Sequence, residues 1–270
     1  MLRAWGYLVL RDLRESYPNV SSVFGEAFLL LLSLVIYGYT AKAFGNSLEQ
    51  KLPATDTYFT FILIGETALF IPFILFEGPI RVIRSAIAED TWDQFVIHPQ
   101  GIQVPVLLQS LAYIPRQVYK ITLTFVFAAL FFSWQLTLSK LLILFFGIFI
   151  SLPIFLGMGL IAAALLIYFG RGASPISYLS SISSILAGAY FPLAVFPKEL
   201  QEVVGALFPF TIVLQGIRNS LVLGWSDPHV YQPLLGIFFV GLFVYKLGCF
   251  LVCRSIVAAI NRGVPFLLTS

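Results

Sequence analysis

Charged residues are scarce in this sequence. Only 11% of its 270 residues are charged, whereas 59% are hydrophobic and the mean hydropathy is +0.93. Soluble domains carry about 25% charged residues, so this chain lacks the polar surface that a soluble globular protein needs. The sequence predicts an all-α polytopic membrane protein with a single transmembrane domain over residues 1–270.

Residues that build metal sites and hydrolase sites are also few. The chain has two histidines and two cysteines, and Cys249 and Cys253 lie four apart in an apolar run without a nearby histidine. We therefore expect small buried apolar side chains there and no metal site. GxxxxGK[ST], HExxH and GxSxG are absent, which excludes the ATPase, zinc-protease and serine-hydrolase sites that these motifs mark. The net charge of +3 gives no argument for nucleic-acid binding.

Long hydrophobic runs dominate what is present, and about 20 apolar residues cross a bilayer core. Six spans are expected: residues 20–44, 57–76, 121–134, 141–169, a fifth from near 176, and 233–253. Residues 1–18, with Trp5, Leu8 and Leu13 near one face, predict a helix lying in the membrane interface. Ten basic residues against five favour both termini in the cytoplasm, so we expect a multi-pass cell-membrane protein.

Two segments do not fit a continuous membrane-spanning helix. Residues 77–103 are the most polar stretch and predict a mainly helical cytoplasmic segment that Pro99 and Gly101 terminate. Residues 186–218 contain Pro192 and Pro197, which break a helix, and irregular backbone at membrane depth must be buried in protein or line a wet cavity. This indicates a broken, re-entrant element facing outward, with a phenylalanine-rich extramembrane loop as the alternative.

Two charges fall within predicted spans. Glu66 lies near the middle of the second span, where an ionised carboxylate costs about 2.5–3.5 kcal/mol, and Lys246 lies in the sixth. Residue counting places both in the inner part of the membrane. They could pair, or Lys246 could extend to the interface while Glu66 is protonated. We hypothesise that Glu66 faces the bundle interior.

Four stretches resemble one family in their order and spacing. They are LVLRDLRESY, RSAIAEDTWDQFVIHP, GAYFPLAVFPKEL and PFTIVLQGIRNSLVLG. Over essentially its whole length the chain resembles a type-2 permease of the ATP-binding-cassette (ABC) transporter superfamily. The resemblance implies an exporter half that pairs with a second permease copy or a related permease. Two separate ATPase subunits would bind ATP and magnesium, so this chain would hold no cofactor and would be a non-catalytic subunit.

The resemblance also implies roles for particular residues. The contact with the ATPase would use carboxylates and a tryptophan anchor, flanked by basic residues: Arg84, Glu89, Asp90, Trp92 and Asp93, with Arg11 and Arg14 as a second contact. The alternatives are a solvated juxtamembrane helix and, for the two N-terminal arginines, lipid headgroup binding. An outward gate would be formed by Gly188, Tyr190, Phe191, Pro192, Phe196 and Pro197. Hydrophobic packing alone is the alternative for these.

The cargo class is only partly indicated. The apolar composition suits a lipid, glycolipid or amphipathic drug better than an ion. RDLRESY favours lipid-linked polysaccharide exporters, whereas the YFP element favours the drug branch. The alternative function is an ATP-independent secondary transporter or channel, and a scaffold or intramembrane enzyme ranks third. Neither the cargo, nor the pairing of permeases as homodimer or heterodimer, nor the identity of the ATPase follows from the sequence.

Overall fold

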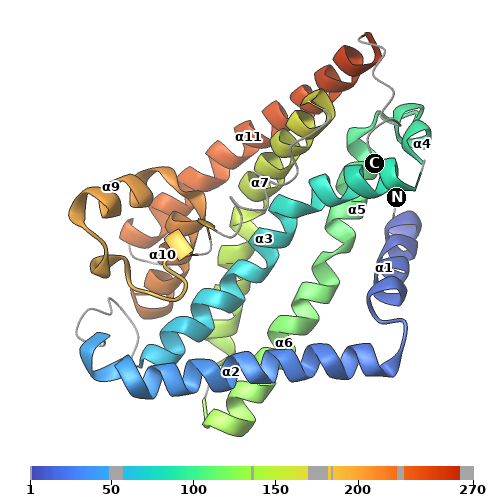
Figure 1. The fold of residues 1–270 in the computed structure, drawn as a ribbon. Helices are drawn as coiled ribbons and strands as arrows, with labels where there is room; N and C mark the ends of the chain where they lie inside the picture. The colour runs from blue at the N-terminus through green and yellow to red at the C-terminus, as the bar shows by residue number, and fades with distance from the viewer. Residues whose placement is uncertain are drawn as a thin grey trace.

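The described part of the chain is mainly α-helical and contains no strand. The computed structural model describes residues 2–48, 57–89, 91–134, 137–169, 182–183, 185–223 and 228–261. The helices there are α1 (Leu2–Ser16), α2 (Val20–Leu48), α3 (Tyr58–Ala88), α4 (Trp92–Val96), α5 (Gln103–Ala112), α6 (Ile114–Phe132), α7 (Leu138–Phe169), the 3₁₀ helix η2 (Leu193–Val195), α9 (Lys198–Leu207), α10 (Pro209–Leu223) and α11 (Pro228–Asn261). Figure 1 shows α3, α7 and α11 running through the bundle, while α2 crosses the outside of α3 and α6.

Helices of membrane-spanning length confirm the predicted class. In the described residues four helices are long and apolar enough to cross a bilayer: Val20–Ala43, Tyr58–Ala88, Leu138–Phe169 and Tyr231–Asn261. The count of six spans stays a prediction. The expected start of the fifth span, near residue 176, lies outside the described residues.

Helix α3 is the centre of the bundle. It packs against α2, α5, α6, α7 and α10, and most of its 31 residues are buried. The prediction that this span ends near Phe76 was wrong. Ile80, Ile83 and Ala86 continue its apolar face at helical spacing and are buried with residues of α5, α7 and α11. The burial of these side chains stabilises the helix as far as Ala88, although this part of the sequence is polar.

Glycines let three helices approach closely. A Cβ on Gly157 of α7 would lie 2.5 Å from the backbone nitrogen of Tyr245 in α11, and a Cβ on Gly248 of α11 would lie 2.8 Å from the Gly157 carbonyl oxygen. Gly159 faces the other way, where a Cβ would lie 2.6 Å from the Phe76 carbonyl oxygen of α3. Small residues thus hold α3, α7 and α11 at backbone contact, the packing that membrane helices favour.

The two cysteines are less buried than expected. Cys249 is half-buried and Cys253 is exposed on α11, with its thiol donating to Oε1 of Gln103 at 2.7 Å. The prediction of buried residues was wrong because the two side chains lie at the edge of the packed helices, where the Cys253 thiol makes an exposed contact with α5.

We predict that Gly157→Ala lowers the free energy of unfolding by about 1–3 kcal/mol, because its methyl group would press against α11 backbone that has no room to move. Gly236→Ala on α11 is the matched control, since nothing lies within 4 Å of a Cβ there. Denaturation in mild detergent measures both. Equal destabilisation by the two variants would contradict a backbone contact between α7 and α11 at Gly157.

Candidate functional site

A buried arginine joins three parts of the chain at one end of the bundle. Arg218 of α10 is only 4% exposed. Its Nη1 donates to the Gly188 carbonyl oxygen at 2.8 Å, and its Nη2 donates to the carbonyl oxygens of Phe61 at 2.8 Å and Ala189 at 3.2 Å. The guanidinium also lies 3.5 Å from the centroid of the Phe61 ring, which adds a cation–π contact.

The local backbone explains why an arginine is needed there. Gly188 has φ +76°, a left-handed conformation that turns the chain out of helix and frees carbonyl groups. In a membrane protein such carbonyls must find donors within the protein. Gly65 makes room for the donor, because a Cβ there would lie 2.4 Å from Nη2 of Arg218. The sequence pattern placed Arg218 in a family motif but did not identify it as a site residue.

The predicted gate residues divide into an anchored part and a projecting part. Gly188 and Pro192 are buried, while Tyr190 is half-buried with its carbonyl oxygen accepting from the Tyr58 hydroxyl at 2.8 Å. Phe191 is 45% exposed, Phe196 is half-buried and Pro197 is exposed. The structure therefore fixes residues 186–190 on α3 and α10, whereas Phe191 and Pro197 lie at the surface.

A sharp bend follows this segment. Helices Lys198–Gly205 and Pro209–Leu221 are together long and apolar enough to cross a bilayer, but their axes meet at 90°. Pro209 begins the second helix, where its missing backbone donor costs nothing. This geometry is that of a broken span or a re-entrant loop.

Glu66 lies beside the same segment but does not pair with Lys246. It is half-buried and hydrogen-bonds Tyr37 of α2, whose ring lies 6.1 Å from that of Tyr190. Lys246 is exposed on α11, and among the described ion pairs none joins it to Glu66. Because α3 extends to Ala88, Glu66 lies in the half of the helix next to Arg218, not in the half next to α4 as residue counting predicted.

The predicted ATPase contact lies at the opposite end of α3. Arg84, Glu89 and Asp93 are exposed, Trp92 is half-buried, and Asp90 lies outside the described residues. Phe95 of α4 is 7% exposed and packs into the same buried cluster as Ile83, while Ile97 next to it is 78% exposed. The segment thus has a buried hydrophobic anchor and an exposed acidic and apolar surface.

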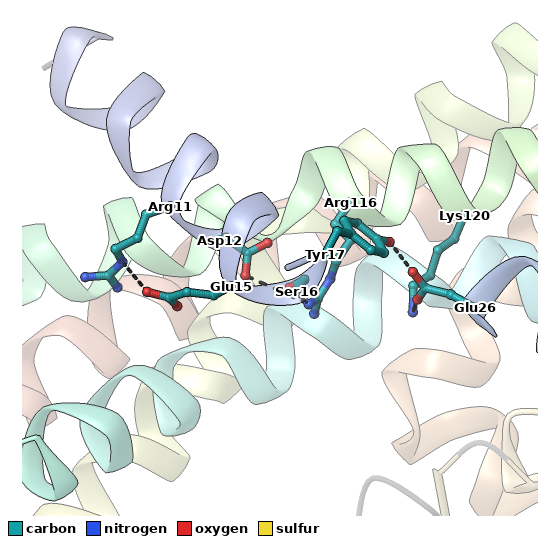
Figure 2. Close-up of polar contacts among 8 residues, drawn as sticks. All are labelled: Arg11, Asp12, Glu15, Ser16, Tyr17, Glu26, Arg116 and Lys120. Carbon is teal, nitrogen blue, oxygen red and sulfur yellow. Dashed lines mark hydrogen bonds and ion pairs between the residues drawn. The ribbon is translucent and has the colours of Figure 1, made fainter. Parts of the chain in front are cut away.

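Helix α1 is fastened to α6 by a polar cluster, which Figure 2 shows. Glu26 of α2 accepts from the Tyr17 hydroxyl and pairs with Lys120. On the other side of the corner, Arg116 donates to Ser16 and lies 3.9 Å from a carboxylate oxygen of Asp12. This cluster fixes the corner between α1 and α2.

Arg11 and Arg14, which were predicted to form a second contact with the ATPase, lie outside the buried part of this polar cluster. Arg11 is exposed and pairs with Glu15 at 3.5 Å, and Arg14 is exposed as well. Asp12, between them, is turned inward and buried, and burial raises the pKa of its carboxyl above the usual value despite the neighbouring Arg116. A carboxylate of this kind makes the corner sensitive to pH.

We predict that Arg218→Met lowers the free energy of unfolding by at least about 2 kcal/mol, because three buried carbonyl oxygens lose their donor. Lys246→Met is the matched control: it removes a charge from a membrane helix at an exposed position and leaves these carbonyls bonded. Thermal unfolding in detergent compares them. A loss of the same size in both would show that Arg218 contributes only its charge.

The raised pKa of Asp12 fixes the sign of a pH effect. The folded chain binds this proton more tightly than the unfolded chain, whose carboxyl has a pKa of 3.8, so stability falls as pH rises from about 4 through the folded pKa. We expect Asp12→Asn to lose this decline, and Glu15→Gln, whose side chain is 67% exposed, to keep it. Melting temperatures between about pH 4 and 7 measure the difference. An unchanged decline in Asp12→Asn would refute the assignment.

No protein-family model matches this sequence, and no curated protein is significantly similar to it. The likeness to type-2 ABC permeases therefore rests on the four stretches of sequence alone. What it implies for activity and partners is taken up as a proposal.

Proposed function

We propose that this chain is the permease subunit of an ATP-driven ABC exporter. It would form the path for the cargo in the cell membrane and receive its driving force from a separate ATPase subunit. Both termini would lie in the cytoplasm, and a second permease would complete the path. The resemblance motivates this proposal, and the placement of the two candidate regions on α3 supports it.

One observation carries the proposal: a single buried helix connects the exposed acidic segment to the segment held by Arg218. The Phe61 carbonyl that accepts from Arg218 lies in the first turn of α3, and α4 follows its last residue, Ala88. At 1.5 Å per residue these positions are about 40 Å apart. Figure 1 shows α4 and the α9–α10 pair at opposite ends of the bundle.

Such a helix can carry force because it cannot slide freely. Gly159 of α7 would place a Cβ 2.6 Å from the Phe76 carbonyl oxygen, so α3 and α7 are in backbone contact. ATP binding would close the ATPase subunits and push α4 inward. The displacement would travel along α3 to Phe61 and alter how residues 186–190 are held. The exposed Phe191 and the half-buried Phe196 would then part from their counterparts in the second permease.

The surface of the bundle has an apolar groove that fits the proposed class of cargo. A groove of about 670 Å³ runs between α3, α6 and α7 and is lined by apolar side chains, among them Ile71, Val118 and Phe146. Binding sites for drug-sized molecules measure about 300–1,000 Å³. The groove therefore supports a lipid-like or amphipathic cargo rather than an ion.

We predict that Glu89→Lys/Asp93→Lys abolishes co-purification of an ATPase subunit and ATP-dependent transport, because repulsion replaces attraction at exposed positions. Glu199→Lys/Glu202→Lys is the matched control. It makes the same charge change at exposed positions of α9, at the other end of the bundle, and we expect it to keep the ATPase. Pull-down from native membranes and ATPase assays measure both variants.

Two results would contradict the proposal. Loss of the ATPase in both double variants would point to a general charge effect. Transport by the purified chain in vesicles without ATP would instead favour a secondary transporter or channel.

A further inference from the structure

A small cavity opens beside the buried arginine. It measures about 200 Å³ and lies between α10 and the segment around η2. Pro192 and Leu193 form part of its wall on one side, and Arg218, Gln215 and Asn219 of α10 line it on the other. The two amide side chains are one helical turn apart, one on each side of Arg218 along the helix. The cavity thus combines a cation with two polar groups that can donate hydrogen bonds.

Arg218 has more donors than partners. A guanidinium carries five N–H groups, and the three hydrogen bonds to carbonyl oxygens use three of them. Its Nε is buried and has no acceptor. A buried donor left without an acceptor costs about 1–3 kcal/mol, so the Arg218 guanidinium can still donate to a further acceptor.

The positive charge is also without a counter-charge in the part of the chain that the structure describes. No carboxylate there lies within 4 Å of Arg218, and Glu66, next to Gly65 in α3, is turned to Tyr37 instead. Carbonyl dipoles offset the charge only in part. A buried cation without an anion is costly in a medium of low dielectric constant. An anion in the cavity, which Arg218 lines, would supply the counter-charge.

We propose that this cavity binds one oxyanion group, a carboxylate or a phosphate, which Arg218 neutralises and the amides of Gln215 and Asn219 orient. The guanidinium keeps its positive charge beside the cavity, and a charge-assisted hydrogen bond to an oxygen of such a group is stronger than a neutral one. The inference goes beyond the proposed transport function and does not depend on it, because it concerns the isolated chain.

The volume limits the ligand. One water molecule takes up about 30 Å³ of the liquid, so 200 Å³ holds a handful of waters or one small polyatomic anion. It is smaller than the roughly 300–1,000 Å³ of sites that enclose drug-sized molecules. The ligand is therefore either a free inorganic anion or the headgroup of an amphipathic molecule whose apolar part lies outside the cavity.

Binding to the purified full-length chain in nanodiscs of neutral phosphatidylcholine tests this. The probes are inorganic phosphate, dodecyl phosphate and, as the oppositely charged control, dodecyltrimethylammonium. We expect saturable binding of dodecyl phosphate and none of the ammonium compound at the same site. Binding of inorganic phosphate as well would identify a free-anion site, and binding of dodecyl phosphate alone would identify a headgroup site.

Variants assign the binding to the cavity without touching the arginine that holds the fold. Gln215→Ala/Asn219→Ala should weaken binding about a hundredfold or more, since each of the two lost hydrogen bonds to a charged group is worth about 1.5–3 kcal/mol and about 1.4 kcal/mol is a factor of ten. Gln232→Ala, which removes an exposed amide from α11, should leave the affinity unchanged. The proposal is overturned if neither phosphate probe binds the folded protein, or if the double variant binds as tightly as Gln232→Ala.

Discussion

The hydrogen bonds from Arg218 to three backbone carbonyls are the interaction on which this end of the molecule depends. They join α10, the turn at Gly188 and the first turn of α3. A chain that leaves helical geometry inside a membrane exposes carbonyl groups that lipid cannot satisfy, so a donor must come from the protein. An arginine can serve several carbonyls at once because its N–H groups form a rigid fork. The break in the helix and the buried cation therefore require one another.

The second constraint is close packing at glycines. Gly65 admits the guanidinium beside α3, Gly159 brings α7 against α3, and Gly157 brings α11 against α7. Close contact along α3 means that a displacement at its α4 end cannot be absorbed by loose side chains. The same helix that supplies a carbonyl to Arg218 is therefore followed by the exposed acidic segment, and one buried helix connects the two candidate regions.

Sequence reasoning predicted the class of this protein from composition and from long apolar runs, and those features survive in the four candidate spans. It predicted the ends of the helices less well. Residues 77–88 are polar enough to suggest a separate helix outside the membrane, yet Ile80, Ile83 and Ala86 are buried and extend α3. It also missed the role of Arg218, because one arginine in an apolar stretch looks the same whether it faces water or backbone carbonyls. Of the site residues it named, Glu66 and Lys246 lie on different parts of the bundle, and Arg11 and Arg14 are exposed.

By itself the sequence determined the membrane class, the approximate positions of the long helices and the break between residues 186 and 209. These follow from hydrophobicity and from proline, which act locally along the chain. Only the tertiary structure decided which carbonyls Arg218 binds, that a cavity with two amides lies beside it, and that Glu66 meets Tyr37 instead of Lys246. Those outcomes depend on which faces of distant helices meet, and the periodicity of one helix does not specify its neighbours.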